Sequence, residues 1–303
     1  MKSFNIKEKR PKVLLLGNGI TYSSSTQWSE IIKTLSRSGA PGLNMEGIPY
    51  SILASIETSI SDNNRHDKYK AYFEKNYQYK AFPALEELMH VPFDAVLTTN
   101  YTYEIENSII ANYYRKSNNS MKRYARWTKE KPDGKYLIHG FNRVANQTVT
   151  QDIWHIHGEV RRKSSMILTH DEYSHLIAKL VEYNKERGHD YFDFAEAVNF
   201  ESWVDYLILG DLHILGLGFD FSEFDLWWLL TRRLKEDTGK GQIIFYTPEK
   251  EKTDGKKIAI EKALEAMGAR IEHCGIQLTN DHEINKGLYQ EFYKTATQII
   301  RES

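Results

Sequence analysis

The sequence of 303 residues is poor in several features that define specialised classes of protein. Its single cysteine, Cys274, excludes an internal disulfide and a metal site built from four cysteines, and it fits a reducing compartment. Forty basic and forty-one acidic residues leave a formal charge of −1, so no overall field attracts nucleic acid or an anionic membrane. The longest apolar stretch, residues 206–219, contains Asp211 and His213 and is shorter than the ~20 apolar residues of a membrane-spanning helix. We therefore expect a cytoplasmic protein that neither enters a membrane nor binds nucleic acid directly.

Short apolar runs alternate along the chain with segments of helical periodicity. Residues 13–16 form one such run, and apolar residues at helical spacing follow over 28–35. The pattern predicts strands at 212–216, 242–246 and 270–274, and helices at 194–203, 222–235, 255–267 and 283–300. Such alternation predicts an α/β fold: one domain over 1–303 with a doubly wound, mostly parallel, Rossmann-like sheet. We expect helical insertions at about 40–90 and 108–150.

Four of the expected strands end in glycine or polar side chains. Asn100 closes the run Leu97-Thr98-Thr99-Asn100, and two other strands end in Gly17-Asn18-Gly19 and Gly216-Leu217-Gly218. A fourth segment, Trp154-His155-Ile156-His157-Gly158, carries two histidines. Because ligands of open α/β sheets bind outside the carboxyl ends of the strands, these segments predict an active-site edge.

The two glycine segments allow two interpretations. Glycines let a phosphate approach the backbone, but they also permit a tight structural turn between a strand and a helix. The third glycine of the dinucleotide fingerprint is absent after Gly19. Beyond Gly218, Ser222 and Asp225 have the spacing of a helix cap, so Asp225 is interpreted either as a cap or as a ligand contact.

His155 and His157 lie two residues apart, so on a strand their side chains share one face. A metal site there needs further ligands, for which Asp152 and His139 are the nearest candidates in sequence. The commoner role of either histidine is a hydrogen bond within the protein. We therefore predict no metal.

Residues 112–131 interleave basic and aromatic side chains, with Glu130 as the acidic exception. Such a composition is found where proteins bind single strands or phosphates. A solvated insertion or interaction surface is the simpler interpretation, and we favour it.

Taken in order, these segments resemble the SIR2-like family over most of the chain. Gly17-Asn18-Gly19-Ile20 is similar to the opening glycine motif of the family, and Thr98-Thr99-Asn100-Tyr101 is similar to its second motif. Ile156-His157-Gly158 resembles the catalytic-histidine motif, and residues 167–173 resemble the stretch that follows it in bacterial members. Gly216-Leu217-Gly218-Phe219 with Asp225 completes the set.

The resemblance implies that NAD is bound at the carboxyl edge of the sheet and consumed as a substrate. Asn100 would orient the ribose or an attacking water, and His157 would act as general base. The remaining contacts to NAD are expected from Gly17, Asn18, Gly19, Ile20, Thr99, Gly216, Gly218 and Asp225. Many relatives carry an acid two residues after the motif asparagine, where this chain has Thr102. Glu104 or Glu106 replaces that acid only if the following helix turns it inward.

Three functions fit the resemblance. We favour an NAD+ glycohydrolase similar to bacterial SIR2-like effectors that deplete NAD in abortive infection, an antiviral defence. Such a protein is expected to form a homo-oligomer and to be controlled by a ligand or a regulatory protein partner. An NAD-dependent protein deacylase is the second reading, although the four cysteines of the sirtuin zinc module are missing. A non-catalytic nucleotide-binding subunit is the third.

Overall fold

An eight-stranded sheet occupies the centre of the part of the chain that the computed structural model describes. The described residues are 2–21, 48–59, 67, 71–72, 83–109, 125–128, 141–145, 150–160, 162–192, 197–219, 223–235, 241–249, 255–279 and 281–303. The strand order is β10-β9-β8-β2-β3-β6-β5-β4. Pairing is parallel from β10 to β6 and antiparallel at β5 and β4. The predicted doubly wound, mostly parallel sheet is thus confirmed.

Strands β2, β3, β8 and β9 coincide with apolar runs of the sequence. The bounds of the strands in the sheet are β2 (Lys12–Leu16), β3 (Ala95–Thr98), β4 (Ala125–Thr128), β5 (Phe141–Ala145), β6 (Thr150–His155), β8 (Asp211–Leu215), β9 (Ile243–Glu249) and β10 (Ala269–Gln277). Along β2, Val13 and Leu15 enter one core while Leu14 and Leu16 enter the other. Both faces of the strand are therefore buried, which is why its sequence is continuously apolar rather than alternating.

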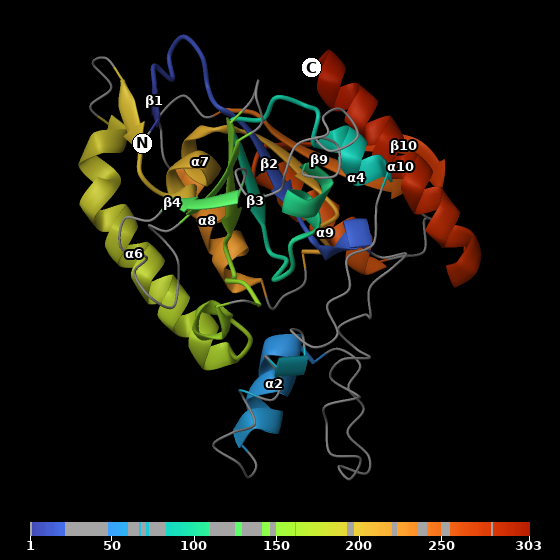
Figure 1. Cartoon of the computed structure of the whole chain (residues 1–303), viewed down its shortest axis with the longest axis horizontal. Coiled ribbons are helices and arrows are strands. Elements are labelled where there is room, and N and C mark those ends of the chain that lie inside the picture. The colour runs from blue at the N-terminus through green and yellow to red at the C-terminus, as the bar shows by residue number, and fades with distance from the viewer. Residues whose placement is uncertain are drawn as a thin grey trace.

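Helices cover the two faces of the sheet, as Figure 1 shows. The core of one face includes side chains from α6 (His170–Phe192), α7 (Trp203–Leu209), α8 (Phe224–Lys235) and α9 (Gly255–Ala266). The other face is covered by α4 (Pro83–Leu88) and α10 (His282–Glu302). In Figure 1, α6 in yellow and α10 in red lie on opposite sides of the sheet. No helix in the described ranges has both the length and the apolar character to cross a membrane.

The order of the strands creates a switch point between β2 and β8. From β2 the chain moves outward through β3 and β6, and it later returns to the other side of β2 to build β8, β9 and β10. Adjacent connections at such a point leave in opposite directions, which opens a crevice at the carboxyl ends of the strands. The two glycine segments lie at this point, since they follow β2 and β8.

Two sequence predictions were wrong. Residues 194–203 were expected to form a helix, but β7 (Val198–Phe200) is a strand that pairs antiparallel with β1 (Lys2–Phe4). The helix begins only at Trp203, where Ser202 and Asp205 form a capping box. The insertion at 108–150 was expected to be helical, but its described residues include β4 and β5, which extend the main sheet. For β7, pairing with the distant β1 overrides the local pattern, whereas β4 and β5 pair with the strands that follow them along the chain.

Some predictions fall on residues that the structure does not describe. The helix over 28–35, His139, Ser222 and most of 112–131 lie outside the described ranges. In the insertion at 40–90, the described parts include α2 (Tyr50–Ser59) and α4, which agrees with the predicted helical character. Short turns of helix also form at η1 (Asn18–Thr21) and η3 (Lys163–Ser165).

Candidate functional site

The four segments that carry the motifs follow four neighbouring strands. In the order β8-β2-β3-β6, register pairs Leu215 with Leu16, Leu16 with Thr98, and Thr98 with His155. These residues form one row across the sheet, and all four strands run in the same direction. Asn100 and His157 each lie two residues beyond this row, so one edge of the sheet presents both predicted catalytic residues.

The two glycine segments pack against each other. The Gly17 amide donates to the carbonyl of Leu215 at 2.9 Å, and the Gly19 amide donates to the carbonyl of Gly216 at 2.8 Å. A Cβ atom at Gly17 would lie 2.4 Å from the Gly216 oxygen, so a side chain there has no room. Gly216 itself has a φ of 69°, a conformation that favours glycine. Close packing thus accounts for these glycines, and the phosphate contact remains a prediction.

The other predicted nucleotide contacts lie around the same loops. Ile20 is fully buried in the core, so its predicted contact with a ligand remains a prediction. The Thr99 amide donates to the carbonyl of Leu16 at 3.3 Å, which continues the sheet pattern past the end of β3. At Gly218 a Cβ atom would meet no atom of the described residues within 4 Å. Within the described part of the chain this glycine therefore has open space beside it.

Asn100 combines a fixed backbone with an unpartnered side chain. Its amide donates to the Thr98 hydroxyl at 3.1 Å, and its carbonyl accepts from Nδ1 of His155 at 2.7 Å. The residue is 7% exposed, yet neither atom of its carboxamide has a hydrogen-bond partner among the described residues. Leaving such a group unpaired costs about 1–3 kcal/mol per atom, so the carboxamide is available to a partner other than the described residues.

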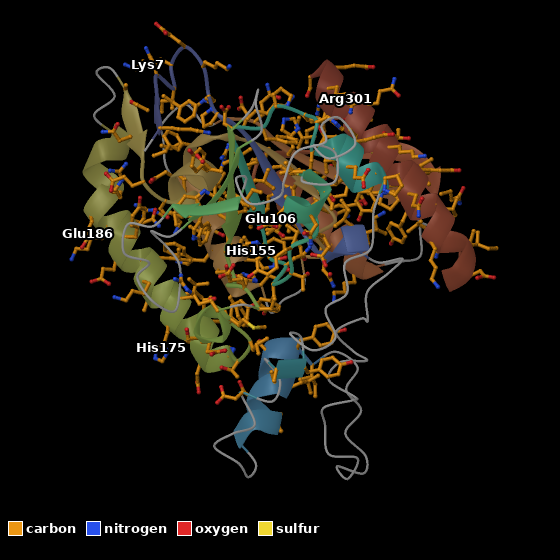
Figure 2. The ribbon with its side chains drawn as sticks, viewed as in Figure 1. Lys7, Glu106, His155, His175, Glu186 and Arg301 are labelled. Atoms are coloured by element: carbon orange, nitrogen blue, oxygen red, sulfur yellow. The ribbon has the colours of Figure 1, made fainter. Side chains whose placement is uncertain are left out.

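His155 fixes Asn100 through a buried ion pair with Glu106. Its Nε2 lies 2.7 Å from a carboxylate oxygen of Glu106, and Figure 2 shows the two residues together inside the molecule. Burial alone lowers the pKa of His155, but Glu106, the Asn100 carbonyl and Glu159 raise it to about 9. Because both ring nitrogens face acceptors, the protonated ring donates from each of them. His155 is therefore a structural cation rather than a base.

Glu106 also supplies an acidic side chain in the segment where Thr102 replaces the usual acid. The helical residues 104–109 turn Glu106 inward to 5% exposure, where it meets His155. Thr102 donates instead to the carboxylate of Glu104. The inward acid of this segment is thus Glu106, and it acts on the backbone of Asn100 through His155.

His157 takes a different partner from the opposite side of the switch point. Its Nε2 lies 2.9 Å from Oδ2 of Asp225 in α8, and both side chains are buried. Burial alone lowers the pKa of His157, but the charge and hydrogen bond of Asp225, with the charge of Glu223, raise it above its ordinary value. Nδ1 faces the hydroxyl of Tyr173 at 3.4 Å. Asp225 thus orients the ring and leaves Nδ1 as the nitrogen that can accept a proton.

The metal interpretation of the two histidines finds no support in these contacts. His155 turns to Glu106 and His157 turns to Asp225, so the rings do not converge on one point. Asp152 lies 3.2 Å from the ammonium of Lys2 instead. Within the described ranges, no group of three or more histidine, cysteine or acidic side chains could hold a metal ion.

A cavity of about 360 Å³ adjoins the glycine loops on the β8 and β9 side of the switch point. It is lined by Gly19, Gly216, Leu217, Gly218, Phe245, Tyr246, Thr247, Pro248, Lys256, Lys257, Ile260, Glu261, Leu278, Tyr289, Phe292 and Tyr293. Most of its walls are aromatic, aliphatic or glycine, and two lysines supply positive charge. Such a cavity suits a ligand with a flat apolar ring and anionic groups.

Two features of the site were missed by sequence reasoning. The bond between His157 and Asp225 joins residues 68 positions apart, and that between His155 and Glu106 joins residues 49 apart. Asp225 was interpreted as a cap or a ligand contact, and its role as the partner of His157 was not foreseen. The capping box of Thr169 and Glu172, in contrast, joins residues only three positions apart, with bonds of 3.0 and 3.3 Å. A local sequence pattern can therefore indicate a helix cap, but it cannot indicate a hydrogen-bonded pair of residues that lie far apart in the chain.

Comparison with known proteins gives one clear finding. Residues 94–271, more than half of the chain, match the family model described as SIR2-like domain. That range includes Asn100, Glu106, His155, His157 and Asp225. No curated protein matches the chain.

Proposed function

Because the chain belongs to the SIR2-like domain family, we propose that it is an NAD+ glycohydrolase, which cleaves the bond between nicotinamide and ribose. Family membership supports NAD-related activity in general. The observation that carries the specific proposal is the carboxamide of Asn100, which is buried and has no partner among the described residues. It lies at the same sheet edge as the paired imidazole of His157.

The chemistry of glycoside cleavage fits these two groups. As the nicotinamide leaves, the ribose carbon acquires the character of an oxocarbenium ion, so the enzyme must position a water and remove its proton. In our proposal the Asn100 carboxamide orients the water or the ribose hydroxyls. Nδ1 of His157 accepts the proton, while Asp225 holds the opposite nitrogen and stabilises the imidazolium that forms. Glu223 adds negative charge at the same place.

The cavity beside the glycine loops supports a placement for the rest of the substrate. Dinucleotides lie across the switch point of doubly wound sheets, with one half on each side. Asn100 and His157 lie beyond β3 and β6, and the cavity lies beyond β8 and β9. We therefore place the nicotinamide half near Asn100 and the adenosine half in the cavity.

The biological role that we propose is a regulated NAD-depleting effector in bacterial defence against phage, acting as a homo-oligomer under a regulatory partner. This part rests on the resemblance of the motifs. Asn100 is 7% exposed and His157 is 3% exposed, so both side chains lie away from bulk solvent. The need for regulation follows from the proposed reaction, because unrestrained activity would exhaust the NAD of the cell.

The proposal is tested by incubating NAD with the purified chain and separating the products by chromatography. We expect release of nicotinamide by the wild type and its loss in Asn100→Ala and His157→Ala. His175→Ala, which changes an exposed histidine of α6 (Figure 2), serves as the matched control and should retain activity. Binding of NAD without release of nicotinamide would contradict the proposal and favour a nucleotide-binding module. Turnover of acyl peptides faster than loss of NAD would favour a deacylase.

A further inference from the structure

The hydroxyl of Tyr293 is buried and unpartnered beside the glycine loops. Tyr293 lies in α10, beyond the residues that match the family model, and it is 1% exposed. Among the described residues its hydroxyl has no hydrogen-bond partner. The oxygen lies 3.0 Å from the positions that a Cβ atom would take at Gly19 and at Gly216. Tyr293 and both glycines line the same cavity, so the hydroxyl faces the place where the two loops meet.

Packing alone does not explain this hydroxyl. The ring of Tyr293 lies 5.0 Å from that of Phe292 and 6.4 Å from that of Tyr289, and a phenylalanine would make the same contacts. The other buried tyrosine of the cavity, Tyr246, uses its hydroxyl within the protein, where it lies 2.9 Å from Nδ1 of His213. A buried unpaired hydroxyl is a net cost to stability. The hydroxyl of Tyr293 is therefore better explained by a ligand.

The surroundings indicate which ligand atoms it meets. Burial raises the pKa of Tyr293 well above its ordinary value, so the hydroxyl stays protonated and can donate. Lys256, Lys257 and Glu261 line the same cavity, and Glu261 lies 3.6 Å from Lys257. A donor near two lysines, at a point where glycines allow close approach, favours an anionic oxygen such as that of a phosphate.

We propose that the Tyr293 hydroxyl donates a hydrogen bond to a phosphate oxygen of the bound dinucleotide. The C-terminal helix α10 thereby contributes a binding residue from outside the matched part of the chain. This inference rests on the proposed placement of the adenosine half in the cavity. It adds that the pyrophosphate lies over Gly19 and Gly216, within reach of α10.

The test compares Tyr293→Phe with the wild type by calorimetry, using ADP and adenosine as probes. Because a hydrogen bond to a charged acceptor is lost, ADP should bind Tyr293→Phe about ten- to hundred-fold more weakly. Adenosine, which lacks phosphate, should bind both proteins with affinities within about two-fold. In NAD cleavage, KM should rise while kcat stays within about two-fold, since the contact is made equally before and during the reaction.

Tyr183→Phe is the matched control, because it makes the same chemical change at a tyrosine in α6 whose hydroxyl donates to Asp205 at 2.7 Å. It should lower the unfolding temperature and leave the affinity for ADP unchanged. Tyr293→Phe should weaken ADP binding and should not lower the unfolding temperature.

Equal affinity of Tyr293→Phe and the wild type for ADP would overturn the inference. An equal loss of affinity for adenosine would also overturn it, because the hydroxyl would then contact the ribose. Failure of the wild type to bind ADP would overturn it as well. Failure of the proposed function has a different signature. A chain that binds ADP through Tyr293 but never releases nicotinamide would retain this inference and lose the hydrolase.

Discussion

Replacing Glu106 with glutamine removes the charge that keeps His155 protonated. Glu106 is 5% exposed and lies 2.7 Å from Nε2 of His155, with no solvent between them to weaken the interaction. Glutamine keeps the size of the side chain and a hydrogen-bonding oxygen. The substitution therefore isolates the effect of the Glu106 charge on His155, whose ring holds the carbonyl of Asn100.

The magnitude follows from the pKa of His155. A rise from 6.5 to about 9 corresponds to a contribution on the order of 3 kcal/mol to the free energy of unfolding. Because the folded pKa is raised, this contribution is fully present below pH 6.5 and is lost as the pH rises through about 9. Glu106→Gln should lose most of it at pH 6.5 and little at pH 9, so the stability of the variant should depend less on pH.

Urea unfolding followed by tryptophan fluorescence measures both proteins at pH 6.5 and at pH 9. The wild type should lose stability across this window, and Glu106→Gln should lose much less. Glu182→Gln is the control, since it removes an exposed partner of Lys179 and should leave the pH dependence unchanged. If Glu106→Gln and the wild type lost stability in parallel, the charged state assigned to His155 would be wrong.

Two further predictions concern the base and the glycine loops. Asp225→Asn removes the charge that raises the pKa of His157. The rising limb of the pH profile for nicotinamide release should therefore move to lower pH, and the maximal rate should fall. A limb that stays in place would show that another group is the base. Gly17→Ala forces a Cβ atom to within 2.4 Å of the Gly216 oxygen and should destabilise the protein by about 1–3 kcal/mol in urea unfolding. Gly218→Ala, whose new Cβ meets no atom within 4 Å among the residues that the structure describes, should change stability by less than about 1 kcal/mol. An equal effect of both glycine variants would contradict the packing argument.

Much of the fold could be predicted because the sheet is buried on both faces. Strands β8, β9 and β10 appear in the sequence as apolar runs separated by helical periods, and their predicted positions differ from the observed ones by only a few residues at the ends. The predictions failed where a strand depends on a distant partner. Val198 and Phe200 are buried beside the exposed Asn199, and only pairing with β1 makes three such residues a strand. A single sequence contains no direct signal of that pairing.

The site was predictable in its parts but not in its connections. Asn100 and His157 were identified because each follows an apolar strand and resembles a family motif. Their partners were not, because Glu106 and Asp225 are ordinary acids in helical segments until the fold brings them to a histidine. The unpartnered hydroxyl of Tyr293 had no sequence signal at all, since the tyrosine fits the apolar face of α10 as well as phenylalanine would.

The register between β3 and β6 couples the two proposed catalytic groups. Thr98 pairs with His155, and the next amide of β6, that of Ile156, donates to the carbonyl of Thr98 at 2.9 Å. In this register His155 reaches the carbonyl of Asn100, and His157 lies in the turn after β6, at the ring of Tyr173. A shift of one residue would turn His155 to the opposite face of the sheet and would leave Glu106 buried without its cation. The ion pair of His155 and Glu106 therefore disfavours this shift. It helps to fix the register in which Asn100 and His157 lie at the same edge of the sheet.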